Sequence, residues 1–327
     1  MRKPACWKPA MLILAVMIWI PAAHAGGRAE AVEEQEILHQ LSAKAELIVE
    51  LVNANCVVES WPERRIDLRI VHQYVEDRYE VEIAEGIGVL RMRERLLQRA
   101  ARPPAVWHIR VPADTELTFS SVSGDFESRG DYERLEADSA SGNIDVRGLE
   151  AVMLLDTASG AVRLKQCSGK LSVNTAAGDV RIEDFHGSIR VRTASADVRL
   201  QNLEAEVEAV TASGKIDVSG LIPTGEGIFR SASGDVMVVL ADSPRYDLTL
   251  TSSSGNIQLD LDGHEITGTL EFTALQGSGE IDSPLQFEVV EGFAHAGSLY
   301  IRKIHRVGSA VPKLTLATAS GVARLKP

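Results

Sequence analysis

The sequence predicts an all-β protein, a single-stranded parallel β-solenoid (β-helix) with coils of about 18 residues. Three observations predict this fold. A phrase of the form Ser/Thr-Ala-Ser-Gly recurs along the chain, alternating polar and apolar residues follow each copy, and the copies are almost evenly spaced. A fixed period of this length is typical of a solenoid, because no single copy buries enough apolar surface to fold alone.

The last residue of the phrase, here called the marker position, sets the period. Successive markers are separated by 18, 18, 18, 18, 18, 20 and 21 residues. We expect a sharp corner at each marker, where glycine tolerates a positive φ. The marker residues of the regular copies are Gly124, Gly142, Gly160, Gly178, Ala196, Gly214, Gly234 and Gly255.

The residues around each marker predict strands. Apolar residues two and four positions after the marker alternate with polar ones, and a second alternating stretch precedes the marker, as in half-buried strands. A further apolar position lies seven residues after the marker. Ser or Thr three residues before the marker is expected to stack in register and to form hydrogen bonds along the rod. In three successive copies the core residues after the marker are Ile144, Val146, Leu149, Val162, Leu164, Cys167, Val180, Ile182 and Phe185.

Residues 1–25 have the pattern of a secretory signal peptide. Three basic residues precede the apolar run from Met11 to Ile20, and Ala23-His24-Ala25 fits a cleavage site. The run is short for a membrane span, and no second long apolar stretch follows. We therefore expect an exported chain with no transmembrane segment after cleavage, in the periplasm, at the cell surface or secreted.

Residues 26–45 form a predicted N-terminal lead that covers the open end of the solenoid, because a bare terminal coil is an exposed sheet edge. We expect a short capping helix over Glu33–Leu41, with a strand over the same residues as the alternative. Residues 46–120 are predicted to be irregular first coils, with a protruding excursion near Leu96–Pro104 and a possible helix over Glu94–Arg102. The pattern of Ala105–Phe119 predicts a strand with Val106, His108 and Arg110 facing one way and Trp107, Ile109 and Val111 facing the other.

The regular repeat spans residues 121–261, and residues 262–327 are expected to form looser C-terminal coils, the last built by Leu314, Leu316, Val322 and Leu325. Two cysteines remain after signal cleavage, Cys56 and Cys167. An oxidising compartment permits a disulfide between them, but many coils separate them and core packing is the favoured role for Cys167.

Three segments of this chain resemble the DUF4097 family. They are ELIVELVNANCVVESWPERRIDL, then HIRVPADTELTFSSVSGDF, then the successive TASG(D/N/K)(I/V) units, so the resemblance covers Glu46 to Leu325. It implies a parallel β-solenoid of a secreted or envelope protein, in a family that is described as adhesin-like. It implies no catalytic residues. The chain departs from the common pattern at Asn53-Ala54-Asn55, where glycine is usual.

The sequence predicts no enzyme and no cofactor. The histidines form no HxH or HExxH metal spacing, and no GxSxG motif occurs. Repeated Asp and Asn after the marker suggest calcium, but hydrogen bonding to nearby backbone is the favoured interpretation. A catalytic site, if present, is expected near Asp282, His295 and His305, where the loops lengthen.

One charge pattern predicts a binding surface. Arg163, Arg181 and Arg199 lie three residues after their markers, so stacked coils should align them in a basic column flanked by Asp145 and Asp217. The functional interpretation is a site for an acidic glycan or lipopolysaccharide. The alternative, which we favour at this point, is a solvated face balanced by neighbouring acids.

Together these features predict an exported, non-enzymatic, adhesin-like or envelope-scaffold protein whose flat sides bind an envelope glycan or protein. A polysaccharide-active β-helix enzyme and a self-assembling filament subunit are the alternatives. The formal net charge of −12, which becomes −15 when residues 1–25 and their three positive charges are removed, argues against binding to nucleic acid.

Overall fold

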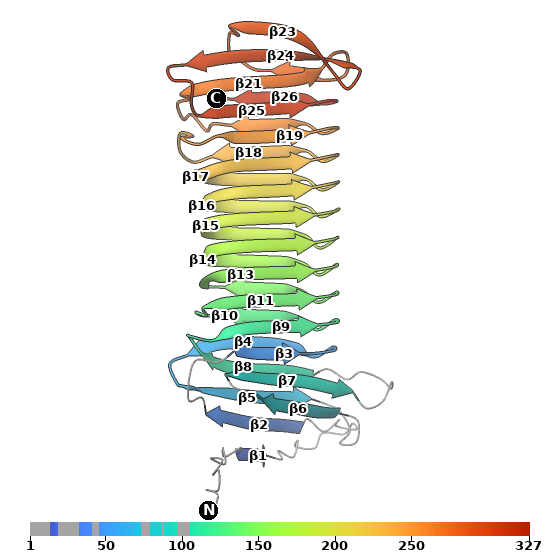
Figure 1. The fold of residues 1–327 in the computed structure, drawn as a ribbon, viewed down its shortest axis with the longest axis vertical. Helices are drawn as coiled ribbons and strands as arrows, with labels where there is room; N and C mark the ends of the chain where they lie inside the picture. The colour runs from blue at the N-terminus through green and yellow to red at the C-terminus, as the bar shows by residue number, and fades with distance from the viewer. Residues whose placement is uncertain (1–13, 19–32, 41–45, 73–78, 87, 97–104) are drawn as a thin grey trace, which may run out of the picture.

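The computed structural model describes residues 14–18, 33–40, 46–72, 79–86, 88–96 and 105–327. These residues form a long rod of β coils stacked along one axis, with no helix in the described part of the chain (Figure 1). The strands belong to one continuous sheet, and those of the regular region pair in parallel. The predicted parallel β-solenoid is therefore confirmed.

The strands in chain order are β1 Leu14–Ile18, β2 Glu33–Gln40, β3 Glu46–Glu50, β4 Asn55–Trp61, β5 Arg65–His72, β6 Tyr79–Glu85, β7 Val89–Leu96, β8 Ala105–Pro112, β9 Glu116–Ser121, β10 Phe126–Arg129, β11 Arg134–Ser139, β12 Ile144–Arg147 and β13 Glu150–Thr157. They continue with β14 Val162–Thr175, β15 Val180–Thr193, β16 Val198–Thr211, β17 Ile216–Ser231, β18 Val236–Leu240, β19 Leu248–Ser252, β20 Ile257–Asp260, β21 Gly268–Leu275, β22 Glu280–Asp282, β23 Val289–His295, β24 Ser298–Val307, β25 Lys313–Thr318 and β26 Val322–Lys326.

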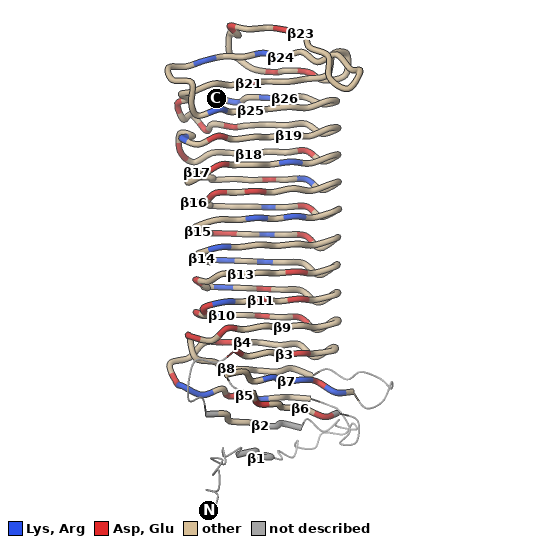
Figure 2. Tube along the Cα trace, viewed as in Figure 1, with Lys and Arg blue, Asp and Glu red and all other residues tan. Residues whose placement is uncertain are grey.

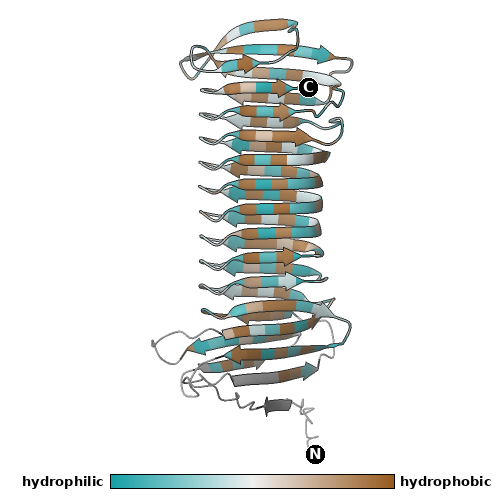
Figure 3. Ribbon diagram, turned by 180° about the vertical axis from the view of Figure 1, so that it is seen from behind, coloured by the Kyte–Doolittle hydropathy of each residue, from teal (hydrophilic) through white to brown (hydrophobic). Residues whose placement is uncertain are grey.

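In the regular region each coil pairs in register with the residues one period away. Val162 lies beside Val180, and Val180 beside Val198. The predicted apolar rows are buried; Ile182 and Phe185, for example, are fully inaccessible. Figure 3 shows the resulting alternation of hydrophobic and hydrophilic residues along each strand. Burial of these rows between coils holds the rod together.

The marker glycines are required for a different reason from the one expected. None of those from Gly124 to Gly255 has a positive φ, so the predicted left-handed corner is wrong. Instead, each marker packs against the marker of the preceding coil. A Cβ added to Gly178 would lie 1.7 Å from the carbonyl oxygen of Gly160. Only a residue without a side chain fits this approach undistorted; nothing in the structure explains why Ala196 is tolerated.

A row of left-handed residues lies at another corner of the coil, six residues after the marker. Gly, Asn and Asp, which adopt this conformation most readily, occupy five of the six positions, and Gln166 occupies the sixth. The row consists of Gly130 (φ 93°), Gly148 (63°), Gln166 (55°), Asp184 (55°), Asn202 (56°) and Gly220 (70°).

The Ser or Thr three residues before each marker holds the corner. Its buried hydroxyl oxygen accepts a hydrogen bond from the marker N–H, at 2.7–3.1 Å in all eight regular coils. In later coils the hydroxyl also donates to the preceding marker carbonyl, as Ser231 does to Gly214 at 3.1 Å. Hydrogen bonding along the rod therefore links hydroxyl to carbonyl.

At the N-terminal end the coils do not stack in chain order. The coil of β3 and β4 lies between β7 and β8 on one side and β9 and β10 on the other. Beyond it, β5 pairs antiparallel with β8, β2 with β5, and β1 with β2. The expected capping helix over Glu33–Leu41 is therefore wrong: residues 33–40 form strand β2, whose backbone continues the sheet.

The first corner also differs from the regular ones. Ala54 occupies the marker position there, since its carbonyl oxygen lies 1.8 Å from a Cβ added to Gly124. The carboxylate of Glu94, which is 3% exposed, accepts hydrogen bonds from the N–H groups of Val52 (2.6 Å), Asn53 (3.1 Å) and Ala54 (3.4 Å). Residues 94–96 belong to β7, so the expected helix does not begin at Glu94; residues 97–104 lie outside the described residues.

The coils at the C-terminal end are also stacked out of chain order. β25 lies between β19 and β21, and β26 lies between β20 and β22. The chain terminus is therefore inside the stack, and β24 and β23 form the outermost layer (Figure 1). Leu314, Leu316 and Leu325 build the last coil of the chain, as predicted, but this coil is not the outermost one, and Ala323 rather than Val322 fills its core.

Both cysteines are free and buried. Burial raises the pKa of both thiols, far above the usual range for Cys56. Residues 14–18 of the predicted signal peptide form β1, and the rest of residues 1–25 lie outside the described residues, so signal cleavage stays a prediction.

Candidate functional site

The structure aligns the predicted basic column. Residues three positions after successive markers lie side by side on the outer face of the coils, so Arg163 neighbours Arg181, and Arg181 neighbours Arg199. Asp145 and Asp217 flank the column on the two sides, as the spacing predicted. Neighbouring coils are about 4.8 Å apart in the hydrogen-bonding direction, so the three guanidinium groups form a short row along the rod axis.

The three arginines are balanced to different degrees. Arg181 forms a hydrogen-bonded ion pair with Glu183 of its own coil. Arg199 pairs with Asp197 at 3.0 Å and more loosely with Asp179 at 3.8 Å. Within the described part of the chain, Arg163 forms no ion pair with a carboxylate. The expected balance by neighbouring acids is therefore incomplete at Arg163.

A groove of about 400 Å³, here called the basic groove, lies over Arg163 and Arg181 of this column; Arg199 is outside its lining. It is lined by Asp145, Arg147, Arg163, Leu164, Lys165, Arg181 and Glu183. Four of these side chains are cationic and two are anionic, so the lining carries a formal charge of +2 on a chain whose total is −12. Hydrogen bonds from Arg181 and then Lys165 lower the pKa of Glu183, so this carboxylate stays ionised and holds both cations in place.

Two of the groove residues were missed from the sequence. Arg147 and Lys165 lie five residues after their markers and neighbour each other in adjacent strands. Arg129 precedes them in the same row. Counting position five in the same way as position three would have found them. Figure 2 shows that positively and negatively charged residues are interspersed along the rod. A local excess of cations is therefore difficult to recognise in the sequence.

The C-terminal residues proposed as an alternative catalytic site are not brought together. Asp282 pairs with Arg324 at 2.7 Å. His295 lies opposite Ser298 in the β23–β24 hairpin, whereas His305 lies opposite Leu270, seven residues farther along β24. The Nδ1 atom of His305 is 2.7 Å from the backbone oxygen of Gln286. This separation removes the arrangement on which the enzyme alternative depended.

The Asp and Asn residues after the markers bind backbone. Asp197 Oδ1, for example, accepts a hydrogen bond from the N–H of Lys215 in the next coil at 3.0 Å, and Asn143 Oδ1 accepts one from Ala161 at 3.0 Å. The interpretation favoured over calcium is thus the one the hydrogen bonds support. In the residues that the structure describes, no three His, Cys, Asp or Glu side chains are grouped to hold a metal ion. Nor does that part of the chain contain a helix long and apolar enough to cross a membrane.

Solved structures with a similar arrangement include three bacterial proteins. One is described as a "putative cell adhesion protein" from Clostridium sporogenes (10% identity, 90% of this chain and 99% of that chain covered, TM-score 0.29). Two come from Parabacteroides distasonis: a "putative lipid binding protein" (18% identity, 74% and 93% covered, TM-score 0.40) and a "putative adhesin" (9% identity, 90% and 98% covered, TM-score 0.41).

No curated protein matches the chain. A family model does: the one described as Toastrack DUF4097 matches residues 107–292, more than half of the chain. The resemblance seen in the repeated units is thereby confirmed, and this protein belongs to the DUF4097 family.

Proposed function

We propose that this protein is an exported, non-enzymatic, adhesin-like protein of the cell envelope, and that its basic groove binds an acidic polysaccharide. The observation that carries the proposal is the local charge of +2 in the lining of the groove, within an acidic chain. The signal-peptide pattern of residues 1–25 supports export.

The shape of the rod favours a linear ligand. Cations repeated at about 4.8 Å along the axis can contact successive carboxylate or phosphate groups of one extended chain. Each exposed contact is weak, about 0–1 kcal/mol, so affinity depends on several acting together. Arg163 is the strongest single contributor we expect, because a ligand anion would not have to displace a carboxylate from it.

The test is charge reversal of the whole column. We expect Arg163→Glu, Arg181→Glu and Arg199→Glu together to weaken binding of the purified protein to polygalacturonate and to purified lipopolysaccharide by at least tenfold, measured by biolayer interferometry at low salt. Raising the salt concentration should weaken wild-type binding as well, because exposed charges are screened.

A matched variant separates the groove from net charge. Arg134→Glu, Arg190→Glu and Arg192→Glu change the total charge by the same amount at residues that do not line the groove, and they should leave binding within about twofold. Equal loss in both variants, or no loss in the column variant, would overturn the proposal. Circular dichroism verifies that both variants are folded.

End-to-end assembly is a second candidate. β23 pairs with β24 along one edge, and the described residues provide no strand for its other edge, so backbone groups there are open to pairing. Light scattering of the purified protein tests this function: growth of particles with concentration supports it, and a constant monomer mass excludes it.

A further inference from the structure

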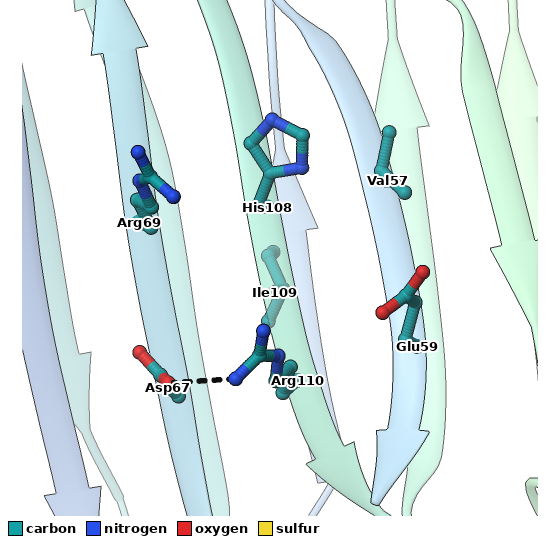
Figure 4. A pocket seen from close by; sticks show the side chains of 7 residues that line it. All are labelled: Val57, Glu59, Asp67, Arg69, His108, Ile109 and Arg110. Carbon is teal, nitrogen blue, oxygen red and sulfur yellow. Dashed lines mark ion pairs between the residues drawn. The ribbon is translucent and has the colours of Figure 1, made fainter.

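A second hollow lies on the same outer face, near the N-terminal end of the rod. It has a volume of about 280 Å³, close to the lower end of the range of small-molecule pockets, about 300–1,000 Å³. Strands β4, β5 and β8 supply its walls (Figure 4). Its lining consists of Val57, Glu59, Asp67, Arg69, His108, Ile109 and Arg110.

The strand order creates this hollow. Arg69 lies beside His108 across the antiparallel β5–β8 pair, and His108 lies beside Val57 across the parallel β8–β4 pair. Two residues along, Asp67, Arg110 and Glu59 form a second row by the same pairings (Figure 4). Six outward side chains thus form two adjacent rows, five of them polar.

Four polar side chains of the pocket, those of Asp67, Arg110, Glu59 and His108, use little of their hydrogen-bonding capacity. Asp67 and Arg110 are 3.8 Å apart, and Glu59 is 3.9 Å from Arg129 of the next coil, so neither ion pair is a hydrogen bond. His108 makes no hydrogen bond or ion pair with any residue that the structure describes. Carboxylate acceptors and guanidinium and imidazole donors therefore face one small space with room between them.

The charges of the pocket are balanced. Arg69 and Arg110 offset Glu59 and Asp67, whereas the basic groove has an excess of cations. A balanced site gives no net attraction to an anion. It suits a neutral ligand whose groups both donate and accept hydrogen bonds, and hydroxyl groups have this property. Val57 adds an apolar surface of the kind that the carbon face of such a ligand can contact.

We propose that this pocket binds one neutral sugar ring. Arg110, between Asp67 and Glu59, provides alternating acceptors and donors for neighbouring hydroxyl groups, and His108 contacts the ring from the adjacent row. The pocket and the basic groove share no lining residue, and Val57 and Asp145, the nearest groove residue in the same row, are two coils apart, about 10 Å at 4.8 Å per coil.

Saturation-transfer NMR on the purified protein tests the proposal, with the methyl glycosides of glucose, galactose, mannose and N-acetylglucosamine as probes. We expect transfer to at least one glycoside. The double variant Asp67→Asn with His108→Ala should lose at least 80% of that signal. His186→Ala, an exposed histidine on a regular coil, and Arg163→Gln in the basic groove should keep it.

Three outcomes would overturn the sugar site: transfer to none of the four glycosides, transfer that survives in the double variant, or a shift of the His108 imidazole resonance by inorganic phosphate without any response to glycosides. Because Arg163→Gln tests the groove separately, failure of the acidic-polysaccharide proposal leaves this result interpretable.

Discussion

The middle of the rod and its two ends have similar sequence patterns, but their coils stack in different orders. In the middle, each coil packs on the copy one period before it and the copy one period after it. At each end, the chain leaves the stack, forms antiparallel strands, and places the terminal repeat of the chain inside the rod. The β3–β4 coil is covered by β7 and β8, with β5 paired beyond β8, and the β25–β26 coil is covered by β21 and β22.

This difference shows how a repeat protein closes its ends. An exposed parallel coil would offer an apolar row and a free edge to other chains. At the C-terminal end the outermost strands, β23 and β24, have little burial, and no residue from Leu275 to Val311 is buried. The strongly apolar terminal repeats are held between two neighbours, so they cannot fray from the rod.

The largest effect is expected from removing residues 313–327. Leu314, Leu316 and Leu325 are at most 4% exposed, and each fully buried leucine contributes about 1.5–3 kcal/mol. Without this segment, β19–β20 and β21–β22 lose the coil that joins them. We expect amide exchange to show lost protection over residues 268–307 and light scattering to show self-association, while residues 126–231 stay protected.

A matched control is Val290→Ser on the outermost strand, where the side chain is 63% exposed. It should change neither protection nor particle size. Retained protection over residues 268–307 in the truncated protein would mean that the inserted coil does not hold the end together.

A smaller but still severe effect is expected from Gly178→Val in the middle. The added Cβ would lie 1.7 Å from a backbone oxygen, so the coil must shift, and we expect a loss of about 3 kcal/mol or more in the free energy of unfolding. Gly148→Asn is the control, because the left-handed φ of 63° suits asparagine and a Cβ there meets nothing within 4 Å. Chemical denaturation measures both; similar losses would contradict the close-approach explanation.

The hydrogen bonds at the corners allow the N-terminal end of the rod to be compared directly with its middle. Thr175→Val keeps the side-chain shape but leaves the N–H of Gly178 without its acceptor, which should cost about 1–3 kcal/mol. Glu94→Ala removes the acceptor of three N–H groups in the first corner and should cost more than Thr175→Val. Exchange at residues 52–54 should rise only in the Glu94 variant; unchanged exchange there would show that the carboxylate does not hold this corner.

The smallest effect is expected from an exposed ion pair. Hydrogen bonds from Arg192 and Arg190 lower the pKa of Glu208, despite partial burial that raises it. A carboxylate with a lowered folded-state pKa stabilises the fold above its unfolded pKa, about 4.3, and this contribution is lost as the pH falls through the folded value.

The variant Glu208→Gln should therefore lose about 0.5 kcal/mol at pH 7 and differ less from the wild type as the pH falls below about 4. Thermal unfolding followed between pH 3 and pH 7 measures the difference. A difference that stays constant over this range would exclude the ion pair as its cause.

The regular coils were predictable residue by residue because their contacts follow the period. The inward positions of Ile144 and Phe185 and the alignment of Arg163 with Arg181 follow from alternation and spacing. The reason for glycine at the marker was not predictable, because the pattern shows only that a side chain is excluded. A positive φ and a close backbone neighbour both favour glycine, so the sequence does not distinguish between them.

The pocket at His108 also could not be predicted from the sequence. The alternation placed His108 and Arg110 on one face of the strand and Trp107 on the other, and in the structure the first two are exposed and Trp107 is buried. Their neighbours Arg69 and Asp67 come from a strand that runs antiparallel to β8, and Val57 and Glu59 come from a coil that stacks out of chain order. No spacing along the chain relates these three segments.

The sequence by itself determined the coil, its period, the inward and outward sides of the residues in the regular coils and the basic column, because each of these depends on contacts between neighbouring copies. Only the tertiary structure decided which copy packs on which at the two ends, since the terminal repeats carry the same alternation and fit several neighbours equally well locally. The order that covers the most apolar surface and leaves the shortest exposed edges depends on the whole chain, and that order also creates the pocket between β4, β5 and β8.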